Sequence, residues 1–274
     1  MPLENPQQYL HLVINTGNVL GVNKKAGQKP SEELVDCLRA TLDAASVAVG
    51  KGGGAAVSRA SDDLREKVTE HERANVKIGA KLFLNDNSTD NLKSAIDTLF
   101  SVLGVECLDN LILAYHPQGR TTNGVANGDA EEAKEGGVMD WTGGRADAIP
   151  DLKALWREME RYALEKKVTQ LGIADLDVNS LQELHSVSEF HPSIAQINIS
   201  TCCVVPPPLQ EFCHQNDIQL LTHSDPEEIL SRDTLAGELN VKGFTPKWTM
   251  RFQVHVKCRG VLAAKGYVVG ARRE

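Results

Sequence analysis

One histidine lies at the end of a predicted strand, a position where α/β proteins often have catalytic residues. The stretch Asn110–Pro117, NLILAYHP, contains an apolar run typical of a buried strand and reaches His116 just before a proline. In α/β barrels the catalytic groups lie at the carboxyl ends of the strands. His116 could therefore serve as a general acid or base, since imidazole titrates near neutral pH. The alternative is a structural polar residue at a strand end.

Cysteine and histidine side chains suggest two further kinds of chemistry. Adjacent residues on a strand point to opposite faces, so one thiol of the pair Cys202-Cys203 would be buried and the other nearer solvent or a partner. Two packed thiols are the alternative. The histidines and cysteines between 185 and 223 show no C-x-x-C or H-x-x-x-H spacing, so the sequence predicts no metal site.

Size and charge restrict the classes of protein to which the chain can belong. Its 274 residues, 41% of them hydrophobic, fit a single α/β barrel of about 250 residues. With 29 basic and 37 acidic side chains its net charge is −8, which disfavours nucleic acid and anionic membrane surfaces as partners. No apolar run approaches the ~20 residues of a membrane span. Because no signal peptide is recognisable either, we expect a cytoplasmic protein with six reduced cysteines.

From residue 76 onward, strand and helix patterns alternate. Strands are predicted over 76–84, 108–115, 168–173, 194–200 and 218–222. Helices are predicted over 88–104, 152–163, 177–184, 206–216 and 225–235. Further strand candidates are 12–15, 261–264 and, more weakly, 55–60. Successive β-α-β units imply a parallel sheet, and a count near eight favours a closed (β/α)8 barrel of the TIM type over an open doubly wound sheet.

Two segments interrupt this alternation. Residues 46–60 are rich in glycine and alanine, and residues 118–150 are rich in glycine and acidic side chains. The GKGGG stretch in the first segment lacks the residue order of a phosphate-binding loop. We therefore expect both segments to be long flexible loops on one domain that spans residues 1–274.

Several motifs carry a resemblance to known families. WREMERYALEKKVTQLGIADLDVNSLQEL (156–184) resembles the aldo-keto reductases, in which a Trp-bearing helix runs into Gly-Lys-Val-x-x-Ile-Gly-x-Ser-Asn. INISTCCVVPPPL (197–209), QLLTHSDPEEIL (219–230) and KCRGVLAAKGY (257–267) resemble more specifically the regulatory (modifier) subunits of glutamate–cysteine ligase. This second resemblance spans nearly the whole chain. It implies an aldo-keto-reductase-like barrel, here with long loops and a shortened C-terminus.

The resemblance to the reductases implies a site made of tyrosine, lysine, aspartate and histidine. Lys81 and His116 match the lysine and the histidine. The Asp-x-x-x-x-Tyr motif that supplies the other two groups is absent, because no aspartate stands five positions before any of the four tyrosines. General acid catalysis contributes ~10²–10⁴ in rate. We therefore expect a non-catalytic protein in which Lys81 and His116 are remnants, with Lys81 paired to a carboxylate that the sequence does not name.

The same resemblance implies positions for NADPH. Residues 174–175 read Ala-Asp where the reductases have a Ser-Asn pair, and His223 replaces a tyrosine that stacks on nicotinamide. Gln196 is a glutamine, as is the residue at the matching position of the reductases. Lys265 stands where a lysine binds the adenosine phosphate, but Gly266 replaces the following serine. We expect no required cofactor, and residual NADPH binding through Gln196 and Lys265 stays open.

The resemblance to the regulatory subunits implies a function and a partner. The chain would form a heterodimer with the catalytic subunit of glutamate–cysteine ligase, raise its effectiveness with glutamate and weaken feedback inhibition by glutathione. A redox-sensitive link through Cys202 or Cys203 is also implied. An NADPH-dependent aldo-keto (carbonyl) reductase and an NADPH-binding redox sensor are the alternative functions.

The docking surface is a separate prediction from composition. The segment 248–267, WTMRFQVHVKCRGVLAAKGY, contains no acidic residue and places Arg251 and Arg259 among large aromatic side chains. Arginine beside aromatics is typical of binding hot spots. We therefore expect this segment to form part of the docking surface. The alternative is that it forms the last strand of the barrel and its approach.

Overall fold

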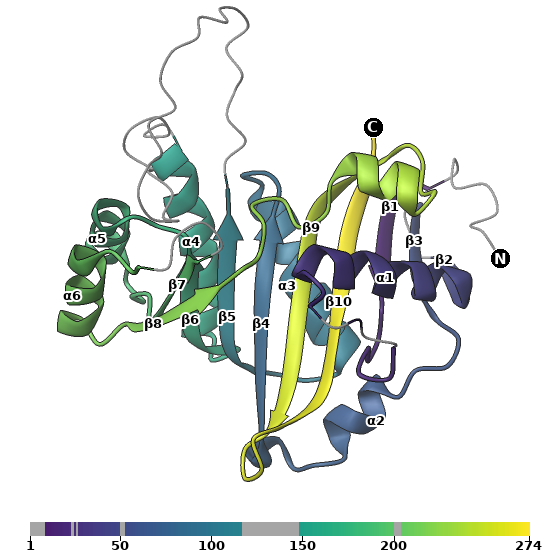
Figure 1. The fold of residues 1–274 in the computed structure, drawn as a ribbon, viewed down its shortest axis with the longest axis horizontal. Coiled ribbons are helices and arrows are strands. Elements are labelled where there is room, and N and C mark those ends of the chain that lie inside the picture. Colours follow the sequence, from purple (N-terminus) through teal and green to yellow (C-terminus); the bar gives the residue numbers. More distant parts are fainter. Residues whose placement is uncertain (1–8, 23–24, 26, 50–52, 117–147, 200–203) are drawn as a thin grey trace, which may run out of the picture.

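The framework of the protein is one ten-stranded sheet. The computed structural model describes residues 9–22, 25, 27–49, 53–116, 148–199 and 204–274. The strands follow the order β2-β3-β1-β10-β9-β4-β5-β6-β7-β8 across the sheet (Figure 1). They are β1 (His11–Asn15), β2 (Ala45–Val49), β3 (Gly54–Arg59), β4 (Val76–Leu84), β5 (Leu108–Tyr115), β6 (Val168–Ala174), β7 (Ile194–Asn198), β8 (Gln219–His223), β9 (Phe244–Val256) and β10 (Val261–Arg273). The helices are α1 (Pro30–Asp43), α2 (Leu64–Thr69), η2 (Arg73–Asn75), α3 (Thr89–Leu103), α4 (Ile149–Leu164), α5 (Val178–Val187), α6 (Pro207–Gln215) and η4 (Thr234–Glu238).

Strands β4 to β8 form the parallel part of the sheet that the sequence predicted. Each pairs in parallel with the next, and α3, α4, α5 and α6 connect them in turn. The predicted helix boundaries are confirmed at two caps. Ser88 accepts a hydrogen bond from the Asn91 amide at the start of α3, and Gly104 ends that helix in the left-handed conformation. Asp177 caps α5 by accepting from the Ser180 amide at 2.9 Å.

The other half of the sheet is mixed. The long strands β9 and β10 form an antiparallel hairpin, in which β9 pairs with β4 and β10 pairs with β1. Strand β3 then lies parallel to β1, and β2 is antiparallel to β3. The hairpin therefore joins the strands near the N-terminus to the parallel half.

The α/β class is confirmed, but the expected closed ring of eight strands is corrected. In the described part of the chain the strand order is linear, and β2 and β8 each pair on one side only. The hairpin explains the difference, because the 13-residue strand β9 occupies the edge of β4 that an earlier strand would take in a barrel. Strand β9 was not predicted, and β10 continues from the predicted 261–264 to Arg273.

Two further predictions about local structure are corrected. The expected loop over 46–60 is corrected in its described part: residues 46–49 belong to β2, and 54–59 form β3, as the weaker strand candidate 55–60 predicted, with Ala55 and Val57 buried. Residues 50–52 lie outside the described part. Because glycine and alanine have low strand propensity, burial of one face, rather than propensity, stabilises β3 as a strand. The helix predicted over 225–235 is reduced to the turn η4, because the Asp225 side chain bonds to neighbouring strands instead of capping a helix. Of the predicted loop 118–150, residues 118–147 lie outside the described part, and α4 begins at Ile149.

The two faces of the sheet are covered unequally. Alternate residues of β4 show this: Leu82 and Leu84 belong to a core formed with α2, α3 and α4, whereas Phe83 belongs to a second core formed with α1. Helix α1 packs over β1 and β3 at one end of the second face. Among the described residues, no helix lies in front of β4 and β5 on that face (Figure 1). This open face carries the polar site. The helices described contain none long and apolar enough to cross a membrane.

Candidate functional site

Lys81 finds its partner on the open face of the sheet. Its amine donates to Asp225 Oδ2 at 2.8 Å, and the side chains of the two residues are 4% and 3% exposed. Arg251, opposite Lys81 on the adjacent strand β9, donates to both oxygens of the same carboxylate at 2.5 and 2.9 Å. The carboxylate that the sequence did not name is therefore Asp225, which follows β8. One carboxylate is shared by two cations.

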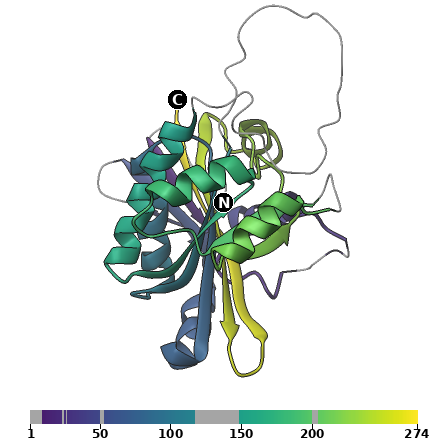
Figure 2. The same cartoon turned by 90° about the vertical axis from the view of Figure 1, so that its left-hand side faces the viewer.

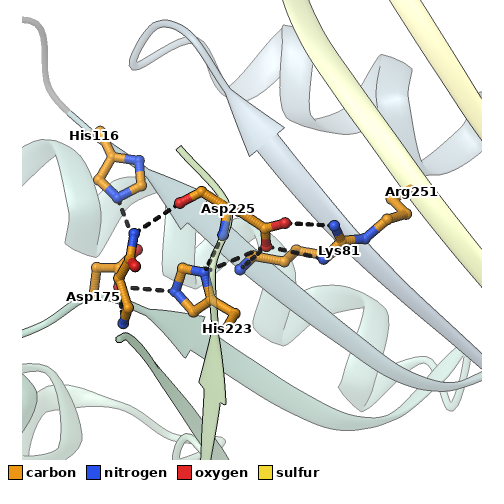
Figure 3. Close-up of polar contacts among 7 residues, drawn as sticks. Lys81, His116, Asp175, His223, Asp225 and Arg251 are labelled. Atoms are coloured by element: carbon orange, nitrogen blue, oxygen red, sulfur yellow. Dashed lines mark hydrogen bonds and ion pairs between the residues drawn. The ribbon is translucent and has the colours of Figure 1, made fainter. Parts of the chain in front are cut away.

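A second carboxylate extends this cluster into a network. Asp175, directly after β6, lies 3.0 Å from His116 Nε2 and 2.9 Å from His223 Nε2 (Figure 3). Asp175 adopts φ +62°, a conformation that aspartate tolerates better than most residues. Nδ1 of His223 lies 3.4 Å from Asp225 Oδ2, and this contact connects the ion pairs around Asp225 to the histidines around Asp175. We call these six residues the charge network: Lys81, His116, Asp175, His223, Asp225 and Arg251.

The charge network shifts the titration of its members. Burial alone would raise the pKa of Asp175, but hydrogen bonds from His116 and His223 lower it to about 2. The pKa of Asp225 is also lowered, because hydrogen bonds from His223 and Arg251 outweigh its burial. Burial disfavours protonation of His223, yet its hydrogen bonds to Asp175 and Asp225 raise the pKa of the imidazole. The pKa of Lys81 is lowered by burial, which Asp225 partly offsets. At neutral pH both carboxylates are thus ionised and hold the cations.

The arrangement lacks the proton donor of a carbonyl reductase. All four tyrosines lie in the described part of the chain. Tyr162 donates to Asp97, and Tyr267 donates to Glu33, which with burial raises the pKa of the Tyr267 phenol. Tyr115 belongs to the core on the opposite face of the sheet.

The fourth, Tyr9, belongs to the second core beside the end of β10, where its carbonyl accepts from Arg273. Lys81 therefore has Asp225 rather than a phenol as its partner. His116 is engaged by Asp175, and this favours the structural interpretation of His116 over the catalytic one.

The residues expected to contact NADPH are not brought together. Gln196 lies on β7 and Lys265 on β10, with β9, β4, β5 and β6 between these strands. The Lys265 amine is paired with Glu33. Gly266 is required by packing, since a Cβ there would lie 2.1 Å from the Gly17 carbonyl oxygen. These positions do not fit NADPH in the manner implied by the reductase resemblance.

The predicted docking segment 248–267 is mostly interior. Trp248, Phe252 and Tyr267 are buried, and Arg251 belongs to the charge network. The expected basic stripe is therefore corrected: β9 and β10 are two central strands of the sheet, whereas the alternative interpretation had one last strand of a barrel and its approach. Arg259 alone of the two arginines is exposed, in the turn that projects from one end of the molecule (Figures 1 and 2).

The cysteines of the described part are free thiols. Cys37 and Cys213 are buried, and burial raises the pKa of each thiol to about 11. Cys258 is exposed in the turn beside Arg259. The pair Cys202-Cys203 lies outside the described residues, so the predicted difference between them stays a prediction. No group of three or more His, Cys, Asp or Glu side chains that could hold a metal ion occurs in the described segments.

Sequence reasoning identified Lys81 and His116 but missed the roles of Asp175, His223 and Asp225. A usable signal was present. His116 and Asp175 directly follow the parallel strands β5 and β6, and His223 is the last residue of β8. Polar residues at the carboxyl ends of parallel strands converge on one edge of the sheet, where α/β proteins place their sites.

Comparison with known proteins identifies the family. Residues 54–226, more than half of the chain, match the Aldo/keto reductase family. The chain belongs to the aldo/keto reductase family. The glutamate–cysteine ligase regulatory subunits of Mus musculus and Homo sapiens are each 34% identical to this chain over 282 residues, covering 96% of this chain and 93% of theirs. A putative glutamate–cysteine ligase regulatory subunit of Schizosaccharomyces pombe (strain 972 / ATCC 24843) is 22% identical over 286 residues, covering 94% and 96%. Both resemblances noted in the sequence are thereby confirmed.

Solved structures of the aldo/keto reductase family are more distant. The aldose reductase of Giardia lamblia is 21% identical, covers 66% of this chain and 59% of its own, and has a TM-score of 0.38. A Bombyx mori aldo-keto reductase in complex with NADP is 16% identical, covers 58% and 45%, and has a TM-score of 0.39.

Proposed function

We propose that this member of the aldo/keto reductase family is a regulatory subunit of glutamate–cysteine ligase. It would bind the catalytic subunit as a heterodimer and tune glutathione biosynthesis by lowering the glutamate requirement and weakening feedback inhibition by glutathione. The observation that carries this proposal is 34% identity to relatives named as regulatory subunits over 96% of this chain and 93% of theirs. Because nearly both full lengths align, the proposal concerns the whole chain and not a shared domain.

The charge network supports a non-catalytic role. A reductase needs a hydroxyl of lowered pKa to protonate the developing alkoxide, and a lysine commonly lowers that pKa. Here the Lys81 amine is bonded to Asp225, and hydrogen bonds hold Tyr162 and Tyr267 to carboxylates elsewhere. The buried ion pairs then contribute to the stability and shape of the fold, with His116 as part of that framework.

Regulation by docking is a coupling between two sites. A subunit raises the affinity of an enzyme for glutamate only if it binds the glutamate-bound form more tightly than the free form. Couplings of this kind are typically ~1–3 kcal/mol, which corresponds to roughly 5- to 150-fold in affinity. We therefore expect the effect on glutamate affinity to lie in this range, and glutamate to strengthen subunit binding reciprocally.

The exposed turn between β9 and β10 is the part of the predicted docking segment that stays available. Residues 257–260 of this turn are exposed and include Lys257 and Arg259. Charge reversal by Arg259→Glu should slow association with the catalytic subunit and weaken its salt dependence, as rim charges do. Lys242→Glu is the matched control, because Lys242 is also exposed but lies before β9. Equal effects of the two substitutions would show that the turn is not part of the interface.

The decisive experiment mixes the purified chain with a glutamate–cysteine ligase catalytic subunit. Size-exclusion chromatography should show a 1:1 complex, and initial rates should show a lower KM for glutamate and a higher inhibition constant for glutathione. Separate elution at micromolar concentrations, together with unchanged kinetics, would refute the proposal. A Cys202→Ser or Cys203→Ser variant should still bind under reducing conditions, and one of them should lose a covalent dimer on non-reducing gels.

The proposal places the complex in the cytoplasm, which the expected reduced state of the cysteines favours. The four cysteines of the described residues are free thiols, consistent with such a compartment. Fractionation of cells that express the tagged chain should recover it with cytoplasmic markers. Recovery with secreted material would contradict this part of the proposal.

A further inference from the structure

A hollow of about 370 Å³ opens on the face of the sheet that carries Lys81. Alternate residues of three neighbouring strands line it in register: Lys81 lies opposite Arg251, Gly79 opposite Gln253, and Lys77 opposite His255. On the other side of β4, Gly79 pairs with Asn110 and Lys81 with Ile112 of β5. The lack of a side chain at Gly79 helps to form the hollow. A Cβ there would lie 2.6 Å from Asn110 Oδ1.

The charged side chains that line this hollow are all basic. They are Lys77, Lys81, Arg251 and, when protonated, His255, and no carboxylate is among the lining residues. Asp225 neutralises only one of the two charges of Lys81 and Arg251. Lys77 is exposed, and no described residue forms an ion pair with its amine. Lys77 therefore adds a positive charge without a described counter-ion to a hollow that no carboxylate lines, in a chain whose net charge is −8.

The uncharged lining contains several hydrogen-bonding groups. Three side-chain amides line the hollow, from Asn110, Gln196 and Gln253. The Gln196 Oε1 atom is buried and has no hydrogen-bond partner among the described residues. Buried polar atoms without partners are uncommon and costly, so this acceptor needs a donor from outside the described chain. Among the lining residues Ile112 offers an apolar side chain on this face, whereas the side chain of Ala80 belongs to the core on the other face.

We propose that this hollow binds a small polar molecule that carries an oxyanion, either a carboxylate or a phosphate, together with hydrogen-bond donors. The oxyanion would lie near Lys77 and the free edge of Arg251, and the amides would orient the rest of the molecule. A volume of about 370 Å³ is within the ~300–1,000 Å³ of ordinary ligand sites. This site goes beyond the proposed docking function and does not depend on it.

The test uses the full free chain and two probes that separate the sources of the oxyanion. Isothermal titration with citrate tests carboxylates, and titration with pyrophosphate tests phosphates. At least one should bind with 1:1 stoichiometry and a Kd of about 1 mM or tighter. Lys77→Gln should weaken that binding about fivefold, because it removes one positive charge near the ligand. Lys242→Gln, an exposed lysine outside the hollow, should leave Kd unchanged.

A second variant tests the shape of the hollow. Gly79→Ala adds a methyl group to its lining and should also weaken binding about fivefold, whereas its thermal unfolding should show that the chain is folded. Binding of neither probe would overturn the proposal. Equal weakening by Lys77→Gln and Lys242→Gln would also overturn it, since that result means general attraction to the surface. Because the measurement needs no catalytic subunit, its failure leaves the proposed regulatory function untouched.

Discussion

The Lys81 amine and the Asp225 carboxylate lie 2.8 Å apart although 144 positions separate them in the chain. Both side chains are almost completely buried, and Arg251 binds the same carboxylate from the next strand. One anion thus compensates two cations inside the protein. Removal of the anion and removal of one cation should therefore have very different consequences.

Asp225→Asn should destabilise the protein far more than Lys81→Met. The first substitution leaves two buried cations without a counter-charge, for which about 3–5 kcal/mol is expected. The second leaves Arg251 paired with Asp225 and replaces an amine by an apolar group of similar length, so about 1 kcal/mol or less is expected. Urea unfolding of the three proteins gives the free energies. Equal losses for the two variants would contradict the sharing of one carboxylate.

Stability should fall on both sides of a maximum near pH 5–6. Because the pKa of Asp175 is lowered to about 2, its contribution is present above its unfolded value of about 3.9 and is lost as the pH falls toward 2. The pKa of His223 is raised, so its contribution is present below about 6.5 and is lost as the pH rises through the folded value. Thermal unfolding across pH 3–9 measures both limbs.

The loss of stability at higher pH can be assigned to one residue with a pair of histidine variants. His223→Gln should flatten the fall in Tm as the pH rises above about 6.5, because it removes a group whose pKa is raised in the folded protein. His214→Gln, at an exposed position in α6, should leave the slope unchanged. An identical slope in the His223 variant would mean that another group controls this limb.

The chain should not oxidise NADPH with simple aldehydes or quinones. The physical reason is the missing proton donor, since the Lys81 amine is bonded to Asp225 and none of the four tyrosines is its partner in the described contacts. Absorbance at 340 nm should stay at the rate of the buffer alone. Turnover above about 0.1 per second that is lost in His116→Ala would establish a reductase instead, since typical enzymes turn over near ~10 per second.

Restoring a side chain at Gly266 should damage the fold. A Cβ at this position would lie 2.1 Å from the Gly17 carbonyl oxygen and 2.6 Å from Phe252 Cζ, so backbone or core must shift. Gly266→Ala should cost about 1–3 kcal/mol or more, as overpacking of a core does. Gly237→Ala is the control, because nothing lies within 4 Å of its Cβ position. Comparable Tm values for the two variants would show that this contact relaxes without cost.

Thiol labelling should divide the cysteines into classes. Cys258 is exposed and should react first, whereas Cys37 and Cys213 should react only on unfolding, since burial hides them and raises the pKa of each thiol to about 11. Mass spectrometry after brief labelling assigns the sites. The same experiment tests the prediction that Cys202 and Cys203 differ, and equal labelling of these two would contradict it.

Much of the parallel half was predictable because its signals are local. Apolar runs, the Ser88 and Asp177 caps and Gly104 mark β4 to β8 and their helices within a few residues. Strand β9 also carries a local signal, because apolar residues alternate with polar ones from Trp248 to Val256, and this signal was missed. The pairing of the hairpin β9–β10 between β4 and β1 depends on contacts that are distant in the chain, and it was not predictable from local patterns.

The contacts of the charge network were also beyond the reach of local sequence signals. The sequence indicated that Lys81 would need a carboxylate and that His116 ends a strand, because each statement depends on one element. Asp225 and Asp175 become their partners only when β4, β6, β8 and β9 are assembled. The Ala-Asp at 174–175 was first noted as a departure from a cofactor motif, yet Asp175 joins two histidines of the network.

The position of β10 has a consequence for synthesis of the protein. Among the ten described strands β10 is synthesised last, yet it lies between β1, the first of them to be synthesised, and β9, which borders the parallel half. The Arg273 amide even donates to the Leu10 carbonyl. On the ribosome, β4 to β8 can begin to assemble while β1 still waits for its neighbour. One edge of β1 therefore stays unpaired until β10 has been synthesised, and an unpaired strand edge favours wrong pairing with other strands.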